Sequence, residues 1–394
     1  MNFKKVILFI HRWLGLISGL VVLIVSITGC IYCFQDEIQD VLHSYRKVEI
    51  QNKPYIGPSV IRHIALDRYP GANATYMYYF GKDRPVGVLV NVAKQGLTYV
   101  YINPYNGKVL HTEILTENFF TVVEYIHLYL LLPPKIGQLV VGISVIIFVV
   151  LMITGIVLWW PKRKTDRKRS FTIKWGARWK RINYDLHNVL GFYATFIALI
   201  IAISGLAIAF EWVSDGIYST ANLGKSYPDE KVFPKSDSLY KPSSLQPVVD
   251  HAFEVVQQQS KKAQMFLIAD NTGKGETVNI TAYANSMRFG NSDMFFFDRY
   301  SGKLLRYLPN IKKSIGMKLN NLNYDIHVGQ VLGLTGKIIA FLASLICATL
   351  PVTGFIIWLG KKKKAKKSPK EKLPLSPEPD KRRPYRAVRH RQSL

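Results

Sequence analysis

The chain has 394 residues, of which 48% are hydrophobic, and it carries a formal net charge of +26 at pH 7. Soluble basic proteins are rarely so apolar, and nucleic-acid-binding proteins rarely contain long uncharged runs. We therefore expect a membrane protein that binds no nucleic acid, in which clustered basic residues mark one side of the bilayer and contact membrane lipids.

Four apolar runs are long enough to cross the hydrocarbon layer, which takes roughly 20 helical residues. The sequence predicts transmembrane helices at 1–34, 136–160, 187–212 and 333–360. Clusters of Lys and Arg flank the first run and follow the second and the fourth. The positive-inside rule places these clusters in the cytoplasm. We expect a multi-pass membrane protein with both termini, a basic loop at 161–186 and a disordered basic tail at 361–394 on the cytoplasmic side.

The first run is expected to remain as a membrane span instead of being removed as a signal peptide. It exceeds the apolar core of a signal, which is roughly 7–15 residues long, and its pattern returns inside the chain. Cys30 and Cys33 form a C-x-x-C at its outer end, and Cys347 lies in the fourth run. The two cysteines of the C-x-x-C are either small packing residues or a redox or disulfide pair, and both interpretations stay open.

The segment 35–135 is predicted to be a soluble module outside the membrane. A polar helix continues the first span over 34–47, and a second helix covers 58–69, with Pro58 at its start and Pro70-Gly71 after it. Alternating or apolar runs predict strands at 74–80, 86–92, 97–102 and 108–111. Residues 117–132 read as a helix that carries His127. This order predicts a helix packed on a short antiparallel sheet.

The segment 213–332 repeats this order as a second outer module. A linker rich in Pro, Ser and Lys at 222–244 precedes a helix at 245–259 and strands near 264–268, 277–283 and 294–297. Residues 99–110 match residues 294–305, and Gly107 and Gly302 are expected to supply the positive φ of the matched turns.

The apolar runs repeat in register as well. His11 and His187 are each followed by Gly at +4, by Thr or Ser at +17 and by Gly at +18. His127 and His327 are each followed, at spacings that agree within one residue, by a Gly, a Thr-Gly pair and a Trp. We predict a mainly α membrane protein with four transmembrane helices in a tandem-duplicated bundle and two outer α+β modules. The pseudo-twofold axis of such a protein stands along the membrane normal.

The duplication arranges four histidines as two pairs. His11 and His187 are expected at the inner surface, and His127 and His327 at the outer surface. A twofold axis places such mates on opposite sides of a common centre, which is the geometry of a haem iron held by two axial imidazoles. Two such sites, roughly 20 Å apart along a helix, would carry electrons across the bilayer. The other five histidines have no matched partner.

Other interpretations of these residues stay open. A histidine at a membrane interface often contacts only lipid headgroups. Zinc is disfavoured because the pairs lack carboxylates or thiolates at ligand spacing. Asp185 and Asp325 each precede a histidine by two residues, so each fits either an acceptor for the N–H of a ligating imidazole or a helix cap. The repeated glycines allow close approach of either a helix or a macrocycle.

At this point the sequence resembles the PepSY-associated transmembrane (PepSY_TM) family. The matching residues are 11–16 (HRWLGL), His127 with 154–161 (TGIVLWWP), His187 with Gly191, and His327 with 353–355 (TGF). The hairpins at Gly107 and Gly302 look like those of PepSY modules. The resemblance implies an iron-regulated inner-membrane protein, of which some members are haem-containing ferric-siderophore reductases. It also implies that His11, His127, His187 and His327 are the axial ligands of two b-type haems. The Asn after His187 and the unmatched Pro351 depart from the pattern and affect haem-edge contacts.

The resulting hypothesis is a transmembrane ferric (siderophore) reductase. Electrons would pass from a cytoplasmic or quinol donor, or from a flavoprotein, to a ferric siderophore or other ferric chelate in the periplasm. The donor must be a separate molecule, because the chain has no flavin or nicotinamide motif. The alternative is a non-enzymatic binding or regulatory protein, whose PepSY modules sense peptides or a periplasmic partner. A siderophore transporter is disfavoured by the small number of spans.

Overall fold

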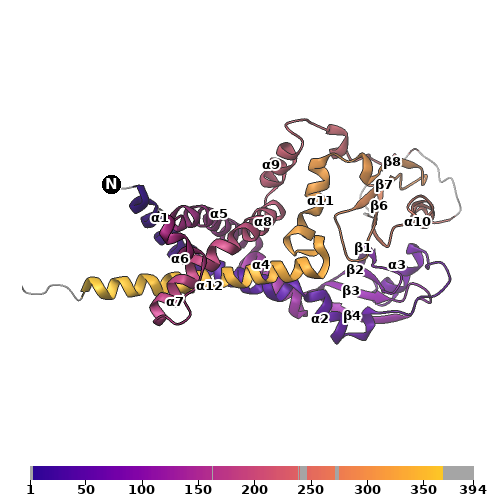
Figure 1. The fold of residues 1–394 in the computed structure, drawn as a ribbon. Coiled ribbons are helices and arrows are strands. Elements are labelled where there is room, and N and C mark those ends of the chain that lie inside the picture. The colour runs from indigo at the N-terminus through magenta and orange to yellow at the C-terminus, as the bar shows by residue number, and fades with distance from the viewer. Residues whose placement is uncertain (1–2, 162, 238, 240–245, 271–274, 367–394) are drawn as a thin grey trace, which may run out of the picture.

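The computed structural model describes residues 3–161, 163–237, 239, 246–270 and 275–366. The described chain separates into a helical bundle and a sheet-containing region (Figure 1). Both described ends of the chain lie at the end of the bundle that points away from the sheet. Helix α12 runs to Lys366, so residues 361–366 of the predicted tail are helical. The remainder of that predicted tail lies outside the described residues.

Four helices of the described residues are long and apolar enough to cross a membrane, in agreement with the four predicted spans. They are α1 (Phe3–Cys33), α5 (Pro134–Trp159), α8 (Gly191–Ala209) and α12 (Gly333–Lys366). Two elements extend α8 toward the N-terminus, namely α7 (Trp179–Asp185) and a π turn over Leu186–Leu190. Helices α1, α5, α8 and α12 contact one another in that cyclic order, so the bundle is a closed ring. The protein is therefore a membrane protein with four spanning helices.

Small side chains line the inside of this ring. Met152, Ala198, Ala202 and Cys347 form its buried cluster, and Gly19 lies against Pro351 of α12. Small residues let helix backbones approach closely, which replaces the hydrophobic driving force that lipid removes. The large apolar side chains of the same helices, such as Ile17 and Leu20, point outward and are exposed, as a lipid-facing surface requires.

The region beyond the bundle is built from both halves of the chain. The first half contributes the following elements: α2 (Gln35–Leu42), η1 (Ser44–Arg46), α3 (Pro58–Asp67), β1 (Asn73–Tyr79), β2 (Val86–Val92), β3 (Gly96–Ile102), β4 (Val109–Ile114), η2 (Leu115–Glu117) and α4 (Phe119–Tyr129). The second half contributes these: α9 (Glu211–Ala221), η5 (Pro228–Lys231), α10 (Val248–Gln259), β5 (Met265–Asp270), β6 (Val278–Tyr283), β7 (Ser292–Phe297), β8 (Leu304–Leu308), η6 (Asn310–Lys312), α11 (Ile315–His327) and η7 (Gln330–Leu332). The inner loop adds η3 (Lys164–Asp166) and α6 (Arg167–Phe171).

All eight strands form one antiparallel sheet in the order β4-β3-β2-β1-β5-β6-β7-β8. The sequence predicted two short sheets, and the structure joins them through β1 and β5, from Tyr76 opposite Ala269 to Tyr79 opposite Phe266. Pairing these strands satisfies two edges that separate modules would expose. The predicted turn glycines are confirmed, since Gly107 and Gly302 have φ values of 73° and 72°.

Helices α3 and α10 pack together on one face of this sheet. Ile61 of α3 and Phe253 of α10 are buried in one core with Val88 and Ile280 of the strands. Arg62 of α3 donates to Asp270 of β5, which ties the two halves together a second time. The shared core makes one rigid layer, beneath which α4 and α11 lead back to the bundle (Figure 1).

Candidate functional site: two histidine pairs

The inner pair lies at the end of the bundle away from the sheet, and its two members come from opposite sides of the ring of helices. His11 belongs to α1, and His187 lies in the π turn that precedes α8. Their ring centroids are 6.5 Å apart and the ring planes are nearly perpendicular, at 89°. The structure thus brings together two residues that are 176 positions apart (187 − 11), as the register match predicted.

The outer pair lies at the opposite end of the bundle, beneath the sheet. His127 is in the last turn of α4, and His327 is the last residue of α11. Their ring centroids are 6.0 Å apart, with an interplanar angle of 65°. His127 contacts Thr28, which lies seventeen residues after His11 on α1. At about 1.5 Å per residue, the two pairs are separated by about 25 Å along that helix.

The spacing within each pair has the size expected for two imidazoles on one metal ion. A ligating imidazole nitrogen lies about 2.0–2.1 Å from its metal. Adding the distance of about 1.1 Å from that nitrogen to the ring centre gives about 6.3 Å between two opposed rings. The centroid separations of 6.5 Å and 6.0 Å lie on either side of this value. The centroid spacing of each pair is therefore compatible with two imidazoles that share one metal ion.

A hydroxyl group on a neighbouring spanning helix contacts Nδ1 of every one of the four histidines. The four contacts are His11–Thr154 at 2.9 Å, His187–Thr353 at 2.9 Å, His127–Thr28 at 3.1 Å and His327–Ser204 at 3.2 Å. The outer histidines add a backbone acceptor, because Nδ1 of His127 lies 2.9 Å from the Val25 carbonyl and Nδ1 of His327 lies 2.9 Å from the Ile201 carbonyl.

These hydroxyls determine which nitrogen of each imidazole carries the proton. Each hydroxyl donates its own hydrogen to a carbonyl one turn earlier in its helix, as Thr154 does to Val150 and Thr353 does to Thr349. The hydroxyl oxygen can then only accept a hydrogen bond from the histidine, so Nδ1 carries the proton and Nε2 keeps a lone pair. No hydrogen bond to any of the four Nε2 atoms occurs within the described part of the chain. Such a tautomer, fixed by an outer acceptor, is the usual state of a metal-ligating histidine.

The glycine after each hydroxyl residue makes room for the ring that the hydroxyl holds. A Cβ atom at Gly205 would lie 2.7 Å from Cε1 of His327, and one at Gly29 would lie 3.2 Å from Cε1 of His127. The corresponding distances are 3.1 Å from Gly354 to His187 and 3.5 Å from Gly155 to His11. The predicted close approach at these glycines is thus an approach to an imidazole. The signal was a Ser/Thr-Gly dipeptide that recurs in all four spans.

Burial keeps the outer imidazoles uncharged. Desolvation lowers the pKa of His127 to about 4, and the neighbouring His327 lowers it further in the same sense. Desolvation also lowers the pKa of His327. Both rings are therefore neutral near pH 7, as a metal-ligating imidazole must be.

Neither aspartate near these histidines contacts an imidazole or caps the helix that carries it. Asp185 is 2% exposed and forms an ion pair with Arg181 at 2.8 Å. Asp325 accepts from the backbone N–H groups of Phe289 and Gly290 in the β6–β7 loop. Both readings of these residues from the sequence were wrong, because spacing along one helix cannot show which neighbouring segment a carboxylate faces.

A charged pocket of about 380 Å³ lies between α2, the strand loops and the start of α12. Its walls include Asp36, Asp40, Arg84, Arg288 and Lys337. Lys337 is buried and donates to Glu37 at 2.8 Å. The sequence did not predict this pocket, because its residues come from four separate segments of the chain. Among the described residues no group of three or more His, Cys, Asp or Glu side chains has the arrangement of a metal site.

Cys33 connects this pocket with the outer pair. Its thiol donates to the carbonyls of Val328 at 3.4 Å and Lys337 at 3.5 Å. Val328 directly follows His327, and Lys337 lines the pocket. The pocket therefore lies beside the outer histidines. Cys30 donates separately to the Phe341 carbonyl, and all three cysteines are free thiols.

The sequence model of the family described as the PepSY-associated TM region matches residues 8–361. That match covers all four spanning helices, the sheet and both histidine pairs. The curated proteins contain no match to the chain.

Proposed function

The chain belongs to the family of the PepSY-associated TM region, and on this premise we propose that it is a di-haem electron-transfer protein of the bacterial inner membrane. It takes electrons from a separate cytoplasmic, quinol or flavoprotein donor and reduces a ferric chelate, of the siderophore type, on the periplasmic side. The observation that carries the proposal is the pair of opposed histidines at each end of one four-helix bundle, with spacings of 6.5 Å and 6.0 Å.

Two haems b fit this donor set better than isolated metal ions do. Each site offers two neutral nitrogens and, within the described residues, no third protein ligand. A macrocycle supplies the remaining four ligands itself, and its apolar face suits a bundle lined by small residues. When bound, a haem with two axial histidines takes up and releases single electrons and leaves no position open for oxygen.

The chain's own residues contribute position and environment. His11 and His187 hold the inner site, and His127 and His327 hold the outer site. The four hydroxyls fix the ring orientation and the tautomer, which raises the basicity of Nε2 as a ligand. The buried cluster of Met152, Ala198, Ala202 and Cys347 lies inside the bundle. Because α4 and α11 end at the outer pair, that site lies directly beneath the sheet and beside the charged pocket, where a ferric chelate has access.

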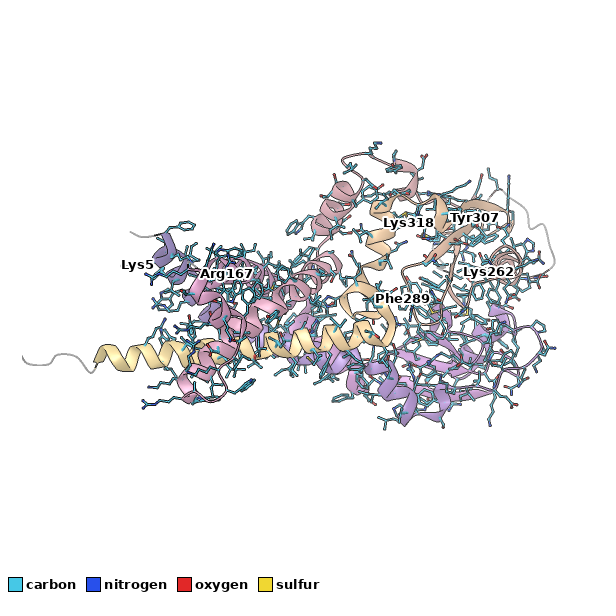
Figure 2. All side chains as sticks on the ribbon, in the orientation of Figure 1. Lys5, Arg167, Lys262, Phe289, Tyr307 and Lys318 are labelled. Atoms are coloured by element: carbon cyan, nitrogen blue, oxygen red, sulfur yellow. The ribbon has the colours of Figure 1, made fainter. Side chains whose placement is uncertain are left out.

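The basic residues support the direction of transfer. Lys5 and Arg167 lie at the end of the bundle away from the sheet, whereas Lys262 lies at the far side of the sheet region (Figure 2). The positive-inside rule puts the first end in the cytoplasm. The inner pair then faces the donor and the outer pair faces the acceptor, with both termini cytoplasmic.

Visible spectra of the purified protein test this function. We expect oxidised and dithionite-reduced spectra of bis-histidine haem, with two haems per chain and two redox transitions. His11→Ala and His127→Ala should each remove or alter a different one of the two transitions. His63→Ala, on an exposed face of α3 where the ring pairs with Asp67, should leave both unchanged. A colourless preparation from cells with ample haem would refute the proposal and favour a peptide-binding or regulatory protein.

A further inference from the structure

The charged pocket beside the outer histidine pair contains one basic side chain that no described residue pairs with. Every carboxylate in the pocket wall already has a cation, and the pairs are Asp36–Arg46, Glu37–Lys337, Asp40–Arg84 and Asp83–Lys47. Two of the three basic residues in the wall, Arg84 and Lys337, are used in these pairs. The third, Arg288, forms no ion pair or hydrogen bond with any residue that the structure describes.

The side chain of Arg288 reaches from the β6–β7 loop to the start of α12. Its Nη2 atom lies 3.3 Å from the position that a Cβ atom would take at Gly333. Gly333 has a φ of 64°, a conformation that favours glycine, so no side chain is added beside the guanidinium there. Lys337 follows one turn later on α12 and lines the same pocket. The guanidinium therefore lies beside the helix that forms one wall of the pocket.

The backbone on both sides of Arg288 is held in place. Met287 has a φ of 58°, which is strained for a residue with a side chain and persists only where neighbouring groups hold it. The bonds that hold the loop are Gln330 to the Met287 carbonyl at 2.7 Å, Ser286 to the Phe80 carbonyl at 2.6 Å, and the N–H groups of Phe289 and Gly290 to Asp325. Phe289 lies between the end of α11 and the sheet (Figure 2). The loop thus presents Arg288 from a fixed position.

The pocket adjoins the segment that carries an outer histidine. Gln330, which holds the loop, lies three residues after His327 and lines the pocket. Val328 directly follows His327, and its carbonyl shares the thiol of Cys33 with the carbonyl of Lys337 in the pocket wall. A molecule bound in the pocket therefore lies next to the outer site, on the side of the sheet region.

An arginine with a fixed backbone and an unpaired guanidinium is suited to bind a carboxylate, with which it can form two parallel hydrogen bonds. Asp325 acts on Arg288 electrostatically, but both of its oxygens accept from the loop N–H groups and it does not line the pocket. The pocket volume of about 380 Å³ lies within the range of small-molecule sites, roughly 300–1,000 Å³. The site therefore has both the charge and the size for a small anionic molecule.

We propose that the charged pocket binds an anionic ferric chelate, and that a carboxylate of the chelate pairs with Arg288. This inference rests on the proposed function and names the class of its acceptor. One electron from the outer site reduces the ferric ion of the bound chelate to the ferrous ion, and the separate donor of the proposed function supplies that electron. Arg288 holds the chelate and takes no part in the transfer itself.

Equilibrium binding of two gallium chelates to the full-length protein in detergent tests the site. Trivalent gallium has the charge and nearly the size of ferric iron but is not reduced, so calorimetry measures binding without turnover. The complex with diethylenetriaminepentaacetate is anionic, whereas the bis(methylamide) of the same chelator gives an uncharged complex of similar size. We expect the anionic complex to bind about tenfold or more tightly. Equal affinities for the two complexes would overturn the inference.

Arg288→Gln should remove this preference, because glutamine keeps hydrogen-bond donors but carries no charge. Arg288→Lys should retain part of it, since an ammonium keeps the charge but lacks the paired donors. Arg68→Gln, at an exposed position at the end of α3, is the matched control and should retain all of it. Equal effects of Arg288→Gln and Arg68→Gln would overturn the inference. If Arg288→Gln misfolds, an unchanged preference in Arg288→Lys would overturn it.

Competition distinguishes a chelate site from a site for any anion. Inorganic phosphate, which also represents a lipid headgroup, should displace the anionic gallium complex only at concentrations well above that of the complex, because phosphate fills little of the pocket. Phosphate that competes as well as the chelate would overturn the inference.

Oxidation of the dithionite-reduced protein by the corresponding ferric complexes connects the site with the proposed function. Arg288→Gln should raise KM for the anionic complex about tenfold and leave kcat nearly unchanged, as expected for a residue that only binds. A fall in kcat with KM unchanged would overturn the inference. A colourless protein that still prefers the anionic gallium complex would overturn the proposed function and support the binding site. Two haems together with equal affinities for the two gallium complexes would overturn this inference alone.

Discussion

Each of the four histidines is held by a hydroxyl that has already donated its own hydrogen. A Ser or Thr hydroxyl that bonds to the carbonyl one turn earlier in its helix has only acceptor capacity left. The four hydroxyls therefore select one imidazole tautomer, and Nε2 of each ring is left for a ligand. Valine has nearly the shape of threonine but cannot accept, so one substitution isolates this effect from packing.

We expect Thr353→Val to weaken cofactor binding at the inner site. The Nδ1–H of His187 loses the hydroxyl acceptor that lies 2.9 Å away, and loss of such an outer partner costs about 10-fold or more in metal affinity. Haem content at limiting haem, read from the visible spectrum, measures the change. Thr349→Val is the matched control, because that hydroxyl lies one turn earlier and is exposed. Equal losses in both variants would contradict a role for the hydroxyl at His187.

The effect of a glycine-to-alanine substitution should depend on how much space lies between the glycine and the imidazole ring beside it. Gly205→Ala places a methyl group 2.7 Å from Cε1 of His327, so the ring must move and its bond to Ile201 must stretch. Overpacking of this kind costs about 1–3 kcal/mol, and the outer redox transition should change. Gly155→Ala makes ordinary contact at 3.5 Å and should leave the inner transition intact. Thermal unfolding and redox titration measure both, and identical behaviour of the two variants would contradict this account.

The pairing of the histidines could be predicted from the sequence, whereas their supports could not. A register that holds over a whole span places His11 beside His187 by symmetry, without any knowledge of side-chain contacts. The link from Thr28-Gly29 to His127 crosses between helices, and helical periodicity says nothing about which neighbour a residue faces. Asp185 and Asp325 were misread for the same reason.

Two capped helices carry the outer histidines. Asn118 caps α4 by accepting from Thr121 at 2.9 Å. Ser314 caps α11 by accepting from Met317, and it also donates to the buried Glu230 at 2.7 Å. The cap of α11 therefore belongs to a buried network, whereas the cap of α4 is a local contact. The two helices should differ in their sensitivity to loss of the cap.

We expect Asn118→Ala to lower the free energy of unfolding by about 1 kcal/mol, the usual cost of losing an N-cap. Ser314→Ala should cost more, about 2–3 kcal/mol, because it also removes the hydroxyl donor that a buried carboxylate uses. Thermal unfolding midpoints in detergent compare the two variants. A larger shift for Asn118→Ala would show that the Glu230 network adds nothing to the cap.

At the same scale, the strands could be predicted one by one, but the single sheet could not. Alternation of apolar residues marks strands, and Gly107 and Gly302 mark their turns. Nothing in the pattern of β1 or β5 shows that each is the other's neighbour, because an edge strand and an inner strand can share one alternation. The contact from Arg62 to Asp270 joins residues 208 positions apart (270 − 62) and lies equally outside sequence reasoning.

Across the whole molecule, the hydroxyl supports stay within one half of the chain, whereas the histidine pairs join the two halves. Within the first half, Thr154 supports His11 and Thr28 supports His127. Within the second half, Thr353 supports His187 and Ser204 supports His327. Each half therefore carries the hydroxyl support for one histidine of each pair, whereas each pair takes one histidine from either half. Association of the halves, through β1 with β5 and through α1 with α12, is what brings two histidines together at each level.

This arrangement predicts the behaviour of a chain divided after Gly176, in the inner loop where nothing crowds the backbone. Residues 1–176 and 177–394, each produced alone, should bind no haem with a bis-histidine spectrum, since each has one axial ligand per site. Produced together, they should copurify with two haems, because the strand pair and the helix contacts that join them remain intact. Spectra and haem content of the copurified fragments measure the outcome. A complete bis-histidine spectrum from either fragment alone would place both ligands of a site within one half and contradict the pairing across halves.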